Sequence, residues 1–138
     1  MTTEVQPLNL SELTTHTIEE LHSLVNDIQS CYHIYKISKG NGKFRVIKAP
    51  NDELKEIQNL LLREVFYTVM PHDVAHGFVP ERSILSNAKP HVGHRMVANF
   101  DITDFFPSTK QKMVQAVLQR HYQMDQSTAL LVAGPQAQ

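Results

Sequence analysis

The sequence contains little of what marks secreted or membrane-spanning proteins. Cys31 is the one cysteine among 138 residues, so no internal disulfide is possible. No apolar run approaches the roughly 18 residues needed to span a bilayer. Residues 1–6 lack the basic start and the apolar run of a secretory signal. A lone thiol is typical of a reducing compartment. We therefore expect a cytoplasmic protein without a membrane partner.

Charge of one sign is missing from each of two neighbouring stretches. Residues 1–30 contain five acids and no lysine or arginine, whereas residues 31–50 contain five cations and no acid. The formal net charge of −1 conceals this separation. The cations are Lys36, Lys39, Lys43, Arg45 and Lys48. On composition alone they fit the solvated edge of a hairpin, where lysines discourage strand pairing.

Capping residues and hydrophobic spacing predict four helices, and residues 81–89 fit a short additional helix closed by Pro90. Residues 17–20 fit a capping box, and helical spacing continues to about Gln29. Asn51 or Asp52 is expected to cap a longer helix that extends to about Met70 and is stopped by Pro71. Its broad apolar stripe predicts that this helix is well buried. The capping-box pattern of Ser108 and Gln111 predicts a third helix that extends to about Tyr122. Asp125 is expected to cap a fourth helix over 126–133, which Gly134 closes.

The basic stretch has the pattern of a β-hairpin. Asn41-Gly42 lies between two apolar runs and favours a type I′ turn, which needs positive φ at both positions. With so tight a turn, Gly40 would pair with Lys43 and Ser38 with Arg45. Lys36, Lys43 and Arg45 would then share one face, and Lys39 would lie on the other. A longer loop would change this register.

Residues 99–108, N-F-D-I-T-D-F-F-P-S, place charge next to a predicted strand. The apolar residues before Asp101 predict a buried strand over 93–101. Because an unpartnered buried carboxylate is costly, Asp101 needs a cation, a donor or water. Hard divalent cations take oxygen ligands, so Asp101 is a candidate metal ligand. Asp104 is expected to serve as a cap or turn residue.

Three segments resemble one enzyme family. N-F-D-I-T-D-F-F-P-S resembles the first catalytic motif of reverse transcriptases of the bacterial retron and group II intron branch. H-G-F-V-P-E-R-S-I-L-S-N-A-K-P-H, residues 76–91, resembles the segment before that motif, and K-G-N-G-K-F-R-V-I-K-A-P, residues 39–50, resembles the fingers hairpin. The three motifs occur in the expected order over about 32–118.

The resemblance implies an α+β fold with an incomplete sheet. A fingers hairpin with helices would be followed by the first strand and helices of a polymerase palm. The expected segments are an N-terminal helical segment over 1–30, fingers over 31–93 and the beginning of the palm over 94–138. An unpaired sheet edge would favour self-association.

The resemblance also implies roles in RNA-directed DNA synthesis. Asp101 would be catalytic and, with the backbone carbonyl of Ile102, would ligate Mg²⁺ or, in its place, Mn²⁺. One of Phe105 and Phe106 would point inward, and Phe106, as the exposed ring, would exclude a 2′-hydroxyl from the dNTP site. Arg45 and Lys39 would bind the triphosphate of the dNTP, with Lys43 as an alternative to Lys39. Arg82 and Asn87 would contact the template or the nucleotide.

The chain also departs from this family. No two aspartates are adjacent, so the Tyr-x-Asp-Asp turn is absent, as is the template-grip motif. One aspartate does not hold two Mg²⁺ ions tightly. We therefore expect the N-terminal part of a reverse transcriptase, inactive alone, as a shortened polypeptide or a split subunit. Its partners would be RNA template, DNA primer, dNTP and the remaining palm and thumb. The alternatives are a non-catalytic nucleic-acid-binding module, for example in antiviral defence, and an interaction domain without nucleic acid.

Overall fold

The computed structural model describes residues 8–134, an α+β arrangement in which helices form the body. The elements are α1 (Leu10–Thr14), α2 (Ile18–Asn26), β1 (Tyr32–Gly40), β2 (Lys43–Pro50), α3 (Asp52–Leu60), η1 (Leu61–Val65), η2 (Phe66–Thr68), α4 (Ile84–Ala88), η3 (Lys89–His91), α5 (Phe105–Ser108), α6 (Gln111–Tyr122) and α7 (Gln126–Ala133). The outer parts of the predicted terminal segments, 1–7 and 135–138, lie outside the described residues. None of the described helices combines the length and apolar character that crossing a membrane requires.

Three helices start where their capping residues predict. Thr17 Oγ1 accepts from the Glu20 backbone N–H at 3.2 Å, and the Glu20 carboxylate accepts from the Thr17 N–H at 2.8 Å. Asn51 Oδ1 accepts from the Leu54 N–H at 2.9 Å at the start of α3. Asp125 accepts the N–H groups of the first turn of α7. These bonds satisfy backbone donors that have no partner inside a helix.

The start of α6 differs from the prediction. Lys110 takes the N-cap position and makes no side-chain cap bond, so the capping box predicted at Ser108 and Gln111 is wrong. Ser108 instead ends α5, where its hydroxyl donates to the Phe105 carbonyl at 2.9 Å. The Gln111 side chain donates to the carbonyl of Gly134. The Ser108 bond stays within α5, whereas the Gln111 bond spans 23 positions and could not follow from local spacing.

The helix predicted after Asn51 changes its winding before it ends. The α3 helix passes into a π-helical turn, η1, and then into a 3₁₀ turn, η2, which ends at Thr68. A π turn adds a residue to the winding and so changes which side chain faces inward. Leu54, Ile57 and Val65 are buried, which confirms that this segment contributes to the core.

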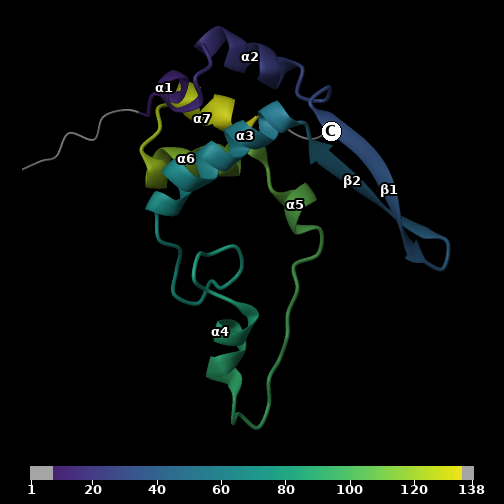
Figure 1. Ribbon diagram of the computed structural model, residues 1–138. Coiled ribbons are helices and arrows are strands. Elements are labelled where there is room, and N and C mark those ends of the chain that lie inside the picture. Colours follow the sequence, from purple (N-terminus) through teal and green to yellow (C-terminus); the bar gives the residue numbers. More distant parts are fainter. Residues whose placement is uncertain (1–7, 135–138) are drawn as a thin grey trace, which may run out of the picture.

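The core joins helices from both halves of the chain. One cluster of buried residues contains Leu10, Leu21, Ile57 and Leu131, and a second contains Val65, Leu118, Met124 and Ala129. Figure 1 shows α1, α2, α3, α6 and α7 gathered together, with the β1–β2 hairpin projecting to one side. The segment 69–109, which leaves and re-enters this body, contains no buried residue. The core therefore lies within the helical body, and this segment contributes no buried residue to it.

The hairpin forms with the predicted pair of Gly40 and Lys43 beside the turn, but the register beyond that pair differs from the prediction. Gly40 pairs with Lys43 around Asn41 and Gly42, whose φ angles are 52° and 73°. An irregularity between Ser38 and Gly40 then leaves Lys39 without a partner in the ladder. Ser38 consequently lies opposite Phe44, and the predicted pairing of Ser38 with Arg45 is wrong. Lys36 lies opposite Val46, so its predicted place on the face of Lys43 and Arg45 is wrong as well. A bulge of this kind inserts one extra residue into a strand and displaces every later pair by one.

The strand predicted over 93–101 is absent. Among residues 8–134, β1 and β2 are the two strands, and they pair only with each other. Residues 92–104 cross from η3 to α5 as irregular chain (Figure 1), and every residue from 91 to 108 is exposed. A strand needs a neighbour to accept its N–H groups and cover its apolar face. No neighbouring strand in the described part of the chain provides this, and the side chain of Phe100 is 95% exposed.

Candidate functional site

Asp101 lies in the exposed segment before α5, not at the end of a buried strand as predicted. Water therefore reaches the carboxylate, and the argument from the cost of burial does not apply to it. Among residues 8–134, no group of three or more His, Cys, Asp or Glu side chains is arranged to hold a metal ion. The described carboxylates thus do not assemble a metal site around Asp101.

Asp104 starts the short helix α5. Its backbone adopts a left-handed conformation, with φ of 51°, and its carbonyl accepts from the Ser108 N–H at 2.9 Å. Its side chain makes no cap bond. The turn role predicted for Asp104 is confirmed, and the backbone rather than the carboxylate performs it.

The two phenylalanines of α5 pack on each other rather than on the core. Their ring centroids are 5.3 Å apart and their planes meet at 77°, an edge-to-face arrangement. Phe105 is 53% exposed and Phe106 is 80% exposed. The prediction that one ring points inward is wrong, because residues 91–108 lie off the helical body. Phe106 is the more exposed ring, as predicted.

The five cations of the hairpin are all exposed. Arg45 lies opposite Ile37 in the ladder, and Lys43, two residues away along β2, shares its face. Lys39 is the unpaired residue at the bulge. The ion pairs in the described part of the chain are His16–Glu53 and Arg82–Asp73, neither of which involves a hairpin cation. The hairpin therefore presents positive charge without a counter-ion among residues 8–134.

Arg82 closes a loop with its side chain. One guanidinium nitrogen donates to the carbonyls of His72 at 2.9 Å, Asp73 at 3.0 Å and Ala75 at 2.5 Å. The other lies 3.5 Å from the Asp73 carboxylate. The side chain is only 18% exposed. Its donors are thus largely used within the loop, so a contact with template would have to compete with these bonds.

The short helix expected over 81–89 forms as α4, Ile84–Ala88, and it starts with a serine capping box that the sequence did not lead us to predict. Ser83 and Ser86 form a reciprocal capping box for α4, with bonds of 3.2 and 2.8 Å, and His76 Nδ1 lies 2.9 Å from Ser86 Oγ. A serine three residues after the cap replaces the usual glutamate or glutamine, and that spacing was the available signal. Asn87 follows within α4, exposed.

Hydrogen bonds at helix caps lower the pKa values of two carboxylates. The Thr17 backbone N–H, followed by the Thr17 hydroxyl, lowers the pKa of Glu20. The Ser127 hydroxyl, followed by the Thr128 backbone N–H, lowers the pKa of Asp125 well below its ordinary range. Both act in the helical body, away from the residues considered for nucleotide binding.

The residues predicted to act together lie on three separate parts of the chain. Lys39, Lys43 and Arg45 are on the hairpin, Arg82 and Asn87 are at α4, and Asp101, Ile102 and Phe106 are around α5. In Figure 1 the hairpin projects from the helical body, whereas α4 lies in the loop that extends away from it. The individual roles in nucleotide, template and metal binding stay predictions.

The sequence is similar to retron reverse transcriptases. Retron Mx162 reverse transcriptase of Myxococcus xanthus is 39% identical over 94 residues, which cover 68% of this chain and 19% of that protein. Retron Ec86 reverse transcriptase of Escherichia coli is 33% identical over 111 residues, 79% of this chain and 35% of that protein. Retron Se72 reverse transcriptase of Salmonella heidelberg is 33% identical over 100 residues, 72% of this chain and 26% of that protein. No family model matches the chain.

The matches cover most of this chain but only a limited share of each relative. The chain spans 19% to 35% of the length of these three proteins. The similarity confirms the resemblance drawn from the three motifs and supports an N-terminal fragment of a retron-type reverse transcriptase.

Proposed function

We propose that this chain is the N-terminal portion of an RNA-directed DNA polymerase and contributes its fingers hairpin and first catalytic motif. The observation that carries the proposal is the similarity to retron reverse transcriptases over up to 79% of the chain. The segments that suggested the family are the hairpin, the loop around α4 and residues 99–108. In this proposal the chain binds template, primer and dNTP as part of a larger enzyme.

The hairpin would hold the phosphates. Arg45 offers a planar fork of donors, and a lysine offers a point charge, which are the two usual ways to bind phosphate oxygens. Arg45 is exposed and has no counter-ion among residues 8–134, which supports this role. Lys39 at the bulge and Lys43 beside the turn remain the two candidates for the accompanying lysine. Phe106 would restrict the sugar by occupying the space of a 2′-hydroxyl.

The described residues do not fit a complete metal site. Polymerases use two ions about 3.5–4 Å apart, which several carboxylates must hold. Asp101 and the Ile102 carbonyl supply one side chain and one backbone oxygen. Mg²⁺ or Mn²⁺ would therefore be bound only when further carboxylates join Asp101 from another segment or another chain. We expect the isolated chain to lack polymerase activity.

The activity test uses the chain alone and in combination. Labelled dNTP is offered with a primed RNA template, and the isolated chain is expected to incorporate none. Addition of a polypeptide that carries the Tyr-x-Asp-Asp motif should allow incorporation, and Asp101→Asn should abolish it. Incorporation by the isolated chain that Asp101→Ala removes would overturn the expectation of inactivity.

The binding test separates the readings that involve nucleic acid from an interaction domain. The affinity for a primer–template duplex should fall as salt rises, because bound cations release counter-ions from the phosphates. Arg45→Ala should weaken binding and reduce the salt slope by about 1. Arg63→Ala is the matched control, since Arg63 is exposed on η1, outside the hairpin. Binding that is indifferent to salt and to Arg45 would favour the interaction domain.

A second candidate is a non-catalytic nucleic-acid-binding module derived from a reverse transcriptase, for example in antiviral defence, and it is favoured by the finding that the carboxylates of residues 8–134 form no metal site around Asp101. Such a module would bind the duplex in the same salt-dependent way. It would gain no polymerase activity from the added polypeptide, and Asp101→Asn would leave its function unchanged.

A further inference from the structure

A cavity of about 330 Å³ lies in the helical body, beside α2, α3, the end of α7 and the base of the hairpin. Pockets for small molecules commonly measure roughly 300–1,000 Å³ and are lined mainly by apolar side chains. None of the residues to which the proposed function gives a role lines this cavity. What it binds is therefore a separate question from template and dNTP binding.

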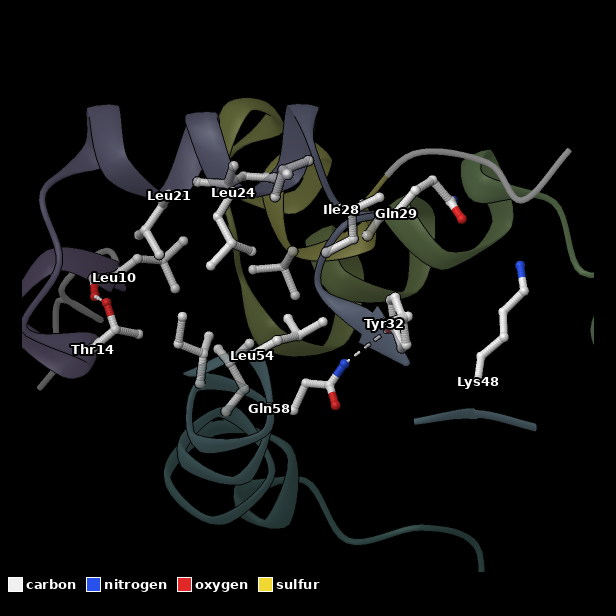
Figure 2. A pocket seen from close by; sticks show the side chains of 17 residues that line it. Leu10, Thr14, Leu21, Leu24, Ile28, Gln29, Tyr32, Lys48, Leu54 and Gln58 are labelled. Atoms are coloured by element: carbon white, nitrogen blue, oxygen red, sulfur yellow. Dashed lines mark hydrogen bonds between the residues drawn. The ribbon is translucent and has the colours of Figure 1, made fainter. Parts of the chain in front are cut away.

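One end of the cavity is closed by buried aliphatic side chains. These are Leu10, Leu21, Leu54, Ile57 and Leu131, which come from four different helices. In Figure 2, Leu10, Leu21 and Leu54 lie toward the left of the cavity. Side chains of this kind form no hydrogen bonds, so this end favours a hydrocarbon chain that would otherwise be exposed to water.

The other end carries polar groups that can act as donors. Figure 2 shows Gln29, Tyr32 and Lys48 toward the right of the view, and Gln58 near the middle with its amide directed toward Tyr32. Gln58 Nε2 donates to the Tyr32 hydroxyl at 3.4 Å, which leaves the hydroxyl proton itself available to an acceptor. Lys48 is exposed at this end and forms no ion pair with a residue in 8–134.

The residues that line the cavity carry positive charge only. Of the 17 lining residues Lys48 is the only charged one, and no acid is among them. An apolar end and a cationic, donor-bearing end match a molecule with a hydrocarbon tail and an anionic acceptor. A carboxylate accepts several hydrogen bonds and pairs with an ammonium group.

We propose that this cavity binds a free aliphatic carboxylate, with its tail among the buried leucines and its head group at Lys48 and Tyr32. The ligand is a dissolved single molecule rather than a membrane surface, because the apolar end is enclosed by the core cluster of Leu10, Leu21, Ile57 and Leu131. A medium-length saturated acid such as decanoate is the appropriate probe.

The test titrates the full chain with decanoate, below its micelle concentration and without nucleic acid, in a calorimeter. One saturable site is expected, with a negative heat-capacity change because apolar surface is buried. Decanol and a decyl trimethylammonium salt, which lack the negative charge, should bind more weakly. Failure of duplex binding would leave this result unaffected, so the two proposals are judged separately.

Two variants locate the site. Lys48→Gln should weaken decanoate binding about threefold to tenfold, the range for an exposed charge-assisted contact. Lys55→Gln is the matched control, because Lys55 is exposed on α3 and does not line the cavity. Val25→Phe fills part of the cavity and should abolish binding. If Val25→Phe does not fold, the affinity of Lys48→Gln for decanoate still tests the proposal, because Lys48 is exposed.

Several results would overturn the proposal. These are the absence of saturable binding, equal affinity for the cationic amphiphile, unchanged affinity in Lys48→Gln, and binding to lipid vesicles without binding of the monomer. Displacement of decanoate by an apolar peptide that binds more tightly, with no dependence on Lys48, would assign the cavity to a polypeptide instead.

Discussion

The guanidinium of Arg82 and the carbonyl oxygen of Ala75 are 2.5 Å apart, and this bond ties α4 back to the chain that precedes it. The same side chain reaches His72 and Asp73. Because no residue of 69–109 is buried, side-chain hydrogen bonds rather than apolar packing hold this loop together.

Replacing Arg82 should therefore open the loop without unfolding the body. Arg82→Ala removes every bond of the guanidinium, and we expect faster amide hydrogen exchange over residues 72–88. The thermal midpoint of the helical body should stay within experimental error of the parent. Arg120→Ala on α6 is the control. Unchanged exchange in the loop would show that Arg82 does not hold it.

The N-cap of α3 should contribute measurably to stability. Asn51→Ala leaves the Leu54 N–H without its acceptor, and the loss is expected to be about 1 kcal/mol. Asn51→Asp keeps an acceptor and should be close to the parent. Denaturant unfolding followed by helical circular dichroism measures the difference. Asn59→Ala, an exposed change within α3, should cost nothing, and an equal loss there would contradict the capping explanation.

Acid should weaken the helical body through Glu20 and Asp125. The pKa of each is lowered in the folded protein, so the folded state binds fewer protons than the unfolded state. Their contribution to the free energy of unfolding is complete above the pKa values of the unfolded chain, which are about 4. It is lost as the pH falls below these values. Asp125→Asn should flatten this loss. Thermal midpoints between about pH 6 and about pH 2 provide the measurement. A midpoint that rises on acidification would contradict the assignment.

The hairpin register can be tested by cross-linking. In a Cys31→Ser background, cysteines at Ser38 and Phe44 should form a disulfide readily, because these residues lie directly opposite each other. Cysteines at Ser38 and Arg45, the pair that the turn alone predicts, should cross-link less. The two rates under mild oxidation decide between the registers. Faster reaction of the second pair would exclude the bulge at Lys39.

Features that depend on neighbouring residues could be predicted from the sequence. Thr17, Asn51 and Asp125 each cap a helix through a bond to a residue two or three positions away. The Asn41-Gly42 turn likewise sets its own φ angles. The register beyond Gly40 was predicted wrongly because the bulge at Lys39 lies outside the turn, and the turn residues do not indicate it.

Features that depend on distant parts of the chain were missed or wrong. The run over 93–101 has the composition of a strand, yet strand formation requires a partner, and the described chain offers none to it. The cavity was not anticipated because its polar end joins Tyr32 to Gln58, 26 positions apart. The motif around Asp101 identified the family, but its arrangement with Arg45 could not follow from spacing.

Leu10 and Leu131 belong to one core cluster, although nearly the whole described chain lies between them. The helical body is consequently completed by contact between α1 and α7. Residues 69–109 branch off from this body and contribute no buried residue to it. Exchange of that branch for a short linker should leave the bundle intact. Phe78, Phe100 and Phe106 of this segment are exposed, so a change in its conformation would break no contact with either core cluster.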